Sequence, residues 1–278
     1  MTRDVVRVAV VQNSAGEEMA RNLDECEALV REAAAAGATF IALPENCTQL
    51  MPSDEAMLEV AHPEESHPAI PRFSALAAEL GTWLLVGSLT IRRGDGRLDN
   101  RSYLFDEQGR VRATYNKIHL FDVEVGDGQQ YHESRTVAHG ERAVMAETPV
   151  GVLGLTICYD LRFPLLYRAL ARAGATVLAV PAAFTRTTGR AHWEVLLRAR
   201  AIENGCYVIA PDQCGRRPWG RETWGHSLIV DPWGEVLADA GEEPGFVCAG
   251  IDPGRVAEVR NRIPSLQHDR PFSGPVLE

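Results

Sequence analysis

Short apolar runs alternate with amphipathic stretches along most of the chain. Residues 5–11 are nearly all apolar and predict a buried strand. Beyond them, apolar residues recur at steps of three and four, the spacing of one helix face, at Met19, Leu23, Cys26, Val30 and Ala33. A second strand is predicted over 39–43 and a second helix over 71–80. The first third of the chain therefore has a β-α-β order.

The middle of the chain changes to strands joined by turns, and the alternation returns after residue 150. Turns rich in Gly and Asp join three predicted strands, at 83–91, 101–105 and 111–115. Strands at 150–157, 176–180 and 207–210 then alternate with helices at 164–173 and 191–203, and strand pairs follow around 226–231 and 246–251.

This mixture of β-α-β units and hairpins predicts an α/β fold whose sheets are each covered by helices on one face. Two sheets packed face to face between two layers of helices satisfy that requirement. No linker rich in Ser, Pro or Gly divides the 278 residues. We therefore expect a single domain over residues 1–278, with about 265–278 as a polar C-terminal tail.

The composition indicates which kinds of partner and which cellular compartment to expect. The chain carries a formal net charge of −10 and its basic residues are scattered, so no surface that follows nucleic-acid phosphates is predicted. No apolar run approaches the roughly 18 residues that a transmembrane helix needs, and the N-terminal stretch lacks a small-residue cleavage site. We expect a cytoplasmic protein that binds neither nucleic acid nor a membrane.

The cysteines indicate neither a metal site nor a disulfide framework. The six of them include no C-x-x-C pair and no Cys and His at the spacing of a zinc finger. A reducing compartment fits this usage better than an oxidising one. No metal and no cofactor are predicted.

Three segments place a charged or nucleophilic residue directly at the end of an apolar strand. They carry Glu45, Lys117 and Cys158. Ligands collect at strand ends in sheets that helices cover, so we expect the three side chains to share one pocket. Pro164 is suited to the first turn of the next helix, which places Cys158 at a strand-to-helix turn, as a nucleophile would be.

The three residue types form a coherent set for attack on an amide. A free thiol has a pKa of about 8.5 and needs a base or a nearby cation at neutral pH. Glu45 can take its proton if a dry pocket raises the pKa of that carboxyl. Lys117 and the backbone N–H of Tyr159 can stabilise the oxyanion. The predicted course is an acyl thioester, release of ammonia, and hydrolysis by water that Glu45 activates.

Several segments resemble the nitrilase superfamily of carbon–nitrogen hydrolases, and most closely its Nit-type branch of deaminated-glutathione amidases and omega-amidases. They are Leu-Pro-Glu, Asn-Lys-Ile-His-Leu-Phe-Asp, Cys-Tyr-Asp-Leu-Arg-Phe-Pro and the stretch 189–204, and the resemblance runs in order from about residue 6 to about 271. It implies a four-layer α-β-β-α sandwich with two mixed sheets, a homodimer formed through a helix layer, and a Glu-Lys-Cys triad at Glu45, Lys117 and Cys158.

The resemblance also implies three further site residues. Glu133 would position Lys117 or the substrate nitrogen, while Arg162 and Thr188 would hold a substrate carboxylate, for which a planar guanidinium is well suited. Each has a simpler alternative. Glu133 can be a solvated side chain, Arg162 can pair with Asp160 to brace the turn, and the Thr188 hydroxyl can cap a helix that begins near residue 190.

The resemblance favours an amidase that cleaves a small linear carboxamide bearing a carboxylate, similar to deaminated glutathione. An omega-amidase acting on 2-oxo acid amides is the alternative within the branch. True nitrilases have Trp-Glu after the nucleophile, whereas this chain has Tyr159 and Asp160. A catalytically silent binding module on the same fold is the alternative of another class. The intact charged set argues against it, because buried charges cost desolvation energy. No histidine is assigned to catalysis.

Overall fold

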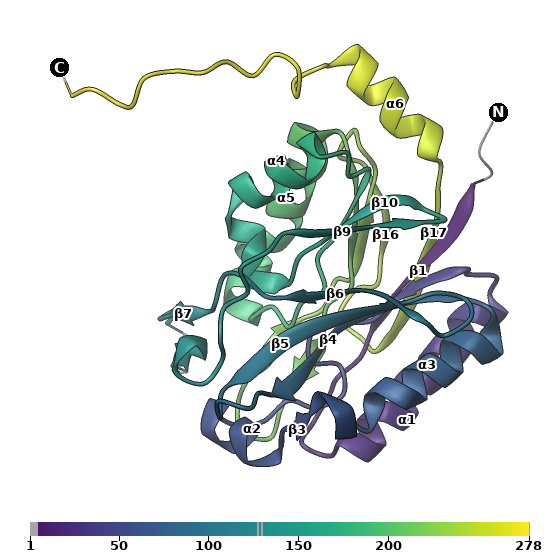
Figure 1. Ribbon diagram of the computed structural model, residues 1–278, viewed down its shortest axis with the longest axis vertical. Coiled ribbons are helices and arrows are strands. Elements are labelled where there is room, and N and C mark those ends of the chain that lie inside the picture. The colour runs from purple at the N-terminus through teal and green to yellow at the C-terminus, as the bar shows by residue number, and fades with distance from the viewer. Residues whose placement is uncertain (1–4, 127, 129, 278) are drawn as a thin grey trace.

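Two β-sheets lie face to face, and helices cover the outer face of each (Figure 1). The structure is a computed structural model, and it describes residues 5–126, 128 and 130–277. The four layers confirm the predicted α-β-β-α sandwich. Each sheet contains both parallel and antiparallel pairs, as expected for mixed sheets.

The first sheet joins the N-terminal half of the chain to a strand from its C-terminal end. Its order is β17-β1-β2-β4-β5-β6, with β3 beside β4. Helices α1 (Met19–Ala35) and α3 (Ala69–Leu80) cover its outer face (Figure 1). The strands are β1 (Val6–Gln12), β2 (Phe40–Ala42), β3 (His62–Pro63), β4 (Trp83–Arg92), β5 (Leu98–Phe105), β6 (Val111–Asn116) and β17 (Gly245–Ile251).

The second sheet is built from the C-terminal half of the chain. Its order is β16-β15-β12-β11-β10-β9, and α4 (Pro164–Arg172) and α5 (Arg186–Asn204) pack on its outer face. The strands are β9 (Val144–Thr148), β10 (Gly151–Leu155), β11 (Val177–Ala179), β12 (Tyr207–Ala210), β15 (Leu228–Val230) and β16 (Val236–Asp239).

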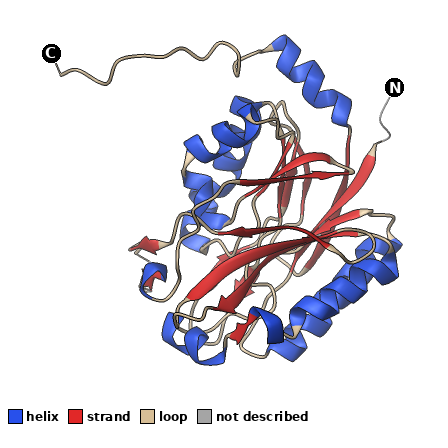
Figure 2. Ribbon diagram, viewed as in Figure 1, coloured by secondary structure: helices blue, strands red, loops and turns tan. Residues whose placement is uncertain are grey.

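Shorter elements complete the molecule (Figure 2). They are α2 (Asp54–Val60), α6 (Pro253–Arg262), the hairpin of β7 (Asp122–Val123) and β8 (Tyr131–His132), the hairpin of β13 (Cys214–Arg216) and β14 (Glu222–Trp224), and the 3-10 helices η1 (Glu64–Ser66), η2 (Glu133–Arg135) and η3 (Cys158–Arg162). In the described part of the chain, none of these helices or the longer ones has the length and apolar character needed to span a bilayer.

The alternation of side chains along β1 explains why this sheet has two buried faces. Val8 and Val10 pack in the core between the sheets, whereas Ala9 and Val11 pack against α1 and α3. Successive residues of a strand point to opposite faces, so a continuous apolar run buries both. Burial at about 25 cal/mol per Å² on both faces makes this central strand a major source of stability.

The predicted helices and strands are largely confirmed, and the differences have local causes. Helix α6 was not predicted, because only Val256 and Val259 of its residues are buried and no long apolar stripe marks it. It begins after Asp252, whose carboxylate accepts a hydrogen bond from the N–H of Gly254. Helix α5 begins at Arg186, five residues before the predicted start, which places Thr188 inside the helix.

Candidate active site

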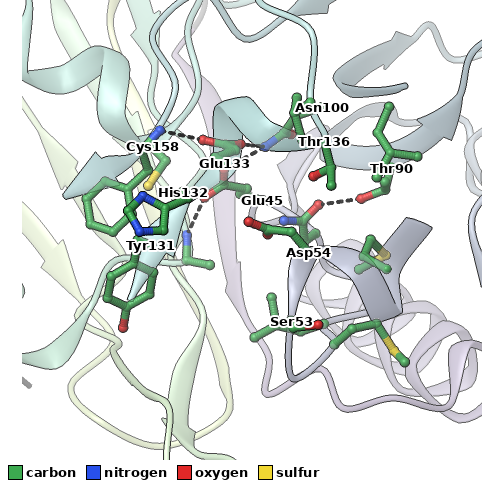
Figure 3. Close-up of a pocket in the computed structure, with 18 of the residues that line it drawn as sticks. Glu45, Ser53, Asp54, Thr90, Asn100, Tyr131, His132, Glu133, Thr136 and Cys158 are labelled. Atoms are coloured by element: carbon green, nitrogen blue, oxygen red, sulfur yellow. Dashed lines mark hydrogen bonds between the residues drawn. The ribbon is translucent and has the colours of Figure 1, made fainter. Parts of the chain in front are cut away.

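A cavity of about 280 Å³ opens where loops that follow strands of both sheets meet. Five of the seven predicted site residues line it: Glu45, Lys117, Glu133, Cys158 and Thr188. The close-up in Figure 3 shows Glu45 and Glu133 between Cys158 on one side of the view and Asp54 on the other. Three distant stretches of sequence therefore deliver an acid, an ammonium and a thiol to one cavity.

Lys117 lies at the centre of a buried charged cluster. Its Nζ is 2.9 Å from Oε1 of Glu45 and 2.9 Å from Oε2 of Glu133, and only 2% of the side chain is exposed. Asn100 donates to both carboxylates, at 2.9 and 3.1 Å. We call these four residues the Lys117 cluster. Burial opposes the charged form of Lys117, but Glu133 and Glu45 outweigh it and raise the pKa well above its ordinary value.

Glu45 does not behave as the sequence analysis required. Burial acts to raise its pKa, but the Lys117 charge, with hydrogen bonds from Lys117, Cys158 and Asn100, leaves the pKa lower than its ordinary value. The expected rise is therefore wrong. The backbone N–H of Ala183 also donates to Oε2 at 2.9 Å, so both oxygens of Glu45 accept hydrogen bonds. Glu45 is an ionised carboxylate held in one orientation.

The glycine at position 87 allows the loop that carries Glu45 to lie against β4. A Cβ atom on Gly87 would lie 2.1 Å from the carbonyl oxygen of Leu43 and 2.4 Å from that of Pro44. Both distances are far shorter than any permitted contact, so a larger residue would displace the backbone just before Glu45. The close approach of these two segments thus sets the position of the carboxylate.

Cys158 occupies the strand-to-helix turn that the sequence predicted. It follows β10 at the start of η3, and its φ angle of 47° is in the left-handed region that side chains other than glycine rarely adopt. Its N–H donates to the carbonyl of Pro181 at 2.9 Å. Burial, followed by the nearby Glu45 carboxylate, raises the pKa of the thiol well above its ordinary value. The resting sulfur is therefore a neutral thiol.

Asp160 organises a second buried cluster that the sequence analysis did not identify. Its Oδ2 accepts hydrogen bonds from the Tyr115 hydroxyl at 2.7 Å and the Ile157 N–H at 2.9 Å. Its Oδ1 accepts from the N–H of His119 at 3.0 Å and lies 2.7 Å from Nδ1 of that ring. We call these groups the Asp160 cluster. It joins the end of β6, which directly precedes Lys117, to the turn that carries Cys158.

The bracing pair proposed for Arg162 is wrong, because the partners of Asp160 are Tyr115, Ile157 and His119. Arg162 lies 3.3 Å from Nδ1 of His192, and its guanidinium stacks over Phe184 at 5.4 Å. Arg162 is not among the described residues that line the cavity, although Phe184 is. The residue is therefore one side chain removed from the cavity.

The alternative role for Thr188 is also wrong. Its hydroxyl lies 2.8 Å from the hydroxyl of Thr185, the residue that precedes α5, and it does not cap a helix start near residue 190. The Tyr159 ring packs against Phe121 and Phe163 and does not line the cavity.

Other residues at the site were missed. Asp212 is completely buried, and burial raises its pKa well above the ordinary value. Its Oδ1 accepts from the N–H of Phe184 at 2.8 Å. Asp212 follows an apolar strand, so the strand-end signal used for Glu45 applied to it as well. Arg221, just before β14, and Asp54, at the start of α2, also line the cavity. Neither follows an apolar strand, so the strand-end signal did not mark them.

Known proteins that resemble this chain are carbon–nitrogen hydrolases, in agreement with the cluster of Glu45, Lys117 and Cys158 at the cavity. The family model described as "Carbon-nitrogen hydrolase" matches residues 7–261. The chain is 45% identical to the deaminated glutathione amidase of Synechocystis sp. over 265 residues, which cover 94% of this chain and 96% of that protein.

Two solved structures share the fold. The NitFhit protein of C. elegans superposes with a TM-score of 0.90 at 35% identity, over 97% of this chain and 66% of that longer one. A variant of the amidase from Nesterenkonia sp. AN1, 27% identical, has a TM-score of 0.79 over 96% of this chain and 97% of that one. It shows covalent addition of the acetamide moiety of fluoroacetamide at the active site cysteine. The present chain belongs to the nitrilase superfamily of carbon–nitrogen hydrolases.

Proposed function

We propose that this carbon–nitrogen hydrolase is a cysteine-dependent amidase whose substrate is deaminated glutathione or a close linear analogue. The 45% identity to a deaminated glutathione amidase over nearly the whole chain supports the substrate. Covalent addition at the cysteine of the Nesterenkonia amidase supports catalysis through a thiol. The observation that carries the proposal is the position of Lys117, 2.9 Å from Glu45 in the cavity that Cys158 lines.

In the first step, Cys158 is the nucleophile and Glu45 is the base. The thiol proton passes to Glu45 as the sulfur bonds to the amide carbon, which converts the carbonyl oxygen into an oxyanion. A neutral thiol and an ionised carboxylate are the protonation states that this transfer needs. The Lys117 ammonium and the N–H of Tyr159 stabilise the oxyanion.

In the second step, Glu45 returns the proton to the amide nitrogen and the carbon–nitrogen bond breaks. The amine leaves, or ammonia in the case of a primary amide, and the acyl thioester remains on Cys158. Water then adds to the thioester carbon as Glu45 takes its proton. Cleavage of the carbon–sulfur bond releases the acid, and Glu45 returns the proton to the sulfur, which regenerates the thiol.

Glu133 is proposed to position Lys117 rather than to meet the substrate nitrogen. Besides its contacts to Lys117, it accepts a hydrogen bond from the N–H of Phe121 at 2.7 Å and one from Asn100. Its oxygens are thus directed at the protein. Arg162 and Thr188 remain predicted to bind a substrate carboxylate, with Thr188 supported by its place in the cavity wall.

Product analysis tests the substrate. The purified chain is incubated with deaminated glutathione, with 2-oxoglutaramate and with glutamine, and the acid and amine products are quantified against the Cys158→Ala variant. We expect the highest kcat/KM for deaminated glutathione. A preference for 2-oxoglutaramate would identify an omega-amidase. Failure of all amides, with Cys158 no more reactive toward iodoacetamide than the core residue Cys26, would leave a binding module.

We also propose that the protein is a homodimer formed through the helix layer of the second sheet. Large apolar side chains are exposed there, with Leu165 on α4 at 83% and Val195 and Ile202 on α5 at 67% and 53%. Exposed apolar surface of this kind marks interfaces. Sedimentation equilibrium gives the mass, and a monomer at micromolar concentration would refute the proposal.

The predicted domain and compartment are proposed on similar grounds. Strand β17 returns to the first sheet after the second is complete, which supports one domain, although residues 1–4, 127, 129 and 278 of the predicted range lie outside the described part. All six cysteines are free thiols, which supports a reducing compartment such as the cytoplasm.

A further inference from the structure

The cavity contains an arginine, Arg221, whose Nε has no hydrogen-bond acceptor among the described residues. Arg221 lines the cavity from the segment that precedes β14, and its guanidinium lies over the Tyr131 ring at 5.6 Å from the centroid. Its Nε is buried and has no hydrogen-bond partner. Among the described residues, the cavity carboxylates Glu45 and Glu133 pair with Lys117 and not with this guanidinium.

The neighbouring Arg217 shows what a structural arginine looks like in the same loop. Its guanidinium donates to the carbonyl oxygens of Ala15, Cys214 and Gly215, and to side-chain oxygens of Thr223 and Gln213. A guanidinium N–H that is buried without such a partner costs free energy, since it loses its hydrogen bond to water. Arg221 is half-buried, and its Nε–H is in this unsatisfied state at the wall of the active-site cavity.

The other cations of the cavity are less suited to bind an anion. Lys117 is held between Glu45 and Glu133. Arg135 is exposed, and the nearby Glu55 carboxylate feels its charge. Asp54 also lines the cavity, and the charge of Arg221 lowers its pKa while burial raises it more strongly. Asp54 therefore offsets part of the Arg221 charge without forming an ion pair with it.

We propose that Arg221 binds a carboxylate of the substrate and makes the enzyme selective for anionic amides. The inference rests on the proposed function. Deaminated glutathione has one carboxylate at its 2-oxo acid end and one at its glycine end, and the planar guanidinium fork fits either one with two parallel hydrogen bonds. Tyr131 supports the guanidinium from one face, which holds the fork in place before the substrate arrives.

Substrates that lack one or both carboxylates test this proposal. The kcat/KM of wild type and of Arg221→Gln is measured for deaminated glutathione and for three analogues. One has its glycine carboxylate converted to an amide, one has a butanoyl group in place of the 2-oxo acid, and one has both changes. A lost hydrogen bond to a charged group corresponds to about a 10- to 100-fold effect.

We expect Arg221→Gln to lower kcat/KM about 10- to 100-fold for deaminated glutathione and to leave the doubly neutral analogue nearly unchanged. The singly neutral analogue that escapes the loss identifies the end that Arg221 contacts. Arg221→Lys should recover part of the activity, because it restores the charge without the fork. The control Arg216→Gln removes an exposed arginine of β13 that lies outside the cavity, and it should behave as wild type.

An equal loss of kcat/KM on all four substrates would overturn the proposal and make Arg221 a structural residue. An unchanged kcat/KM on all four substrates would also overturn it. Turnover of the doubly neutral analogue reports that the variant is folded. The proposed function is tested by wild type alone: it is wrong if wild type cleaves other amides but not deaminated glutathione.

Discussion

Two buried polar clusters depend on the same few residues around β6, yet they differ in what surrounds them. The Lys117 cluster holds three charged groups at the wall of a cavity. The Asp160 cluster surrounds a single carboxylate that is completely buried and accepts four hydrogen bonds from Tyr115, Ile157 and His119. The first leaves one side open to a substrate and the second is closed. Charged groups at the cavity wall can act on a substrate, whereas a fully buried and hydrogen-bonded carboxylate fixes the positions of its neighbours.

The sequence order links the clusters. Tyr115, Lys117 and His119 alternate between them, so Asp160 holds the residues on both sides of Lys117. The same carboxylate accepts from Ile157, directly before the nucleophile. We infer that the closed cluster sets the distance between the ammonium and the thiol. Variants should therefore separate catalysis from stability.

The largest expected effect on catalysis comes from Cys158→Ala. Removal of a nucleophile costs about 10⁶-fold in kcat, whereas truncating one small side chain should leave the fold nearly intact. Product release and thermal unfolding measure the two. Cys206→Ala, at a buried thiol directly before β12 that does not line the cavity, is the control and should remain active. Measurable turnover by Cys158→Ala would remove Cys158 from the role of nucleophile.

Lys117→Ala should lower both catalysis and stability. Loss of an oxyanion donor costs about 10²- to 10³-fold in kcat, with a smaller change in KM, because the charge acts mainly in the transition state. Two buried carboxylates would also lose their partner, which costs about 3 to 5 kcal/mol of unfolding free energy. Steady-state kinetics and urea unfolding measure both losses. An unchanged kcat would refute the oxyanion role.

Asp160→Asn tests the closed cluster. An amide NH₂ in place of one oxygen leaves two donors without an acceptor, and we expect a loss of about 2 to 4 kcal/mol in unfolding free energy. We expect a smaller loss of kcat than in Lys117→Ala, because the reacting groups remain. Asp239→Asn, at an exposed carboxylate paired with His226, is the control and should cost less than about 1 kcal/mol. Equal stability of Asp160→Asn and wild type would contradict the distinction.

The smallest expected effect is a change of stability with pH that Glu45 causes. The pKa of this carboxyl in the folded protein lies below its ordinary value of 4.5, so the unfolded chain takes up the proton first as the pH falls. The stabilisation is therefore fully present above about pH 4.5 and is lost as the pH falls through the lower folded pKa. The difference in unfolding free energy between wild type and Glu45→Gln should shrink below pH 4.5. Growth of that difference on acidification would contradict the direction of the shift.

The sequence by itself determined the elements and the set of reacting groups. The helical spacing from Met19 to Ala33 became α1, with Leu23, Cys26 and Val30 among its buried residues. The apolar run before Cys158 became β10 and the turn after it. Such patterns are local, because the periods of helix and strand place neighbouring residues on the same face whatever the rest of the chain does.

Only the tertiary structure decided how the reacting groups are held and charged. The pKa of Glu45 falls because Lys117, Cys158 and Asn100, from other segments of the chain, outweigh its burial, and the sequence states neither distance nor burial. The partners of Asp160 and the unpaired state of Arg221 likewise depend on contacts between segments far apart in the chain. Residue types and periodicity are local properties of the sequence. The pKa of a side chain, in contrast, depends on all the charges, hydrogen bonds and burial that folding brings around it.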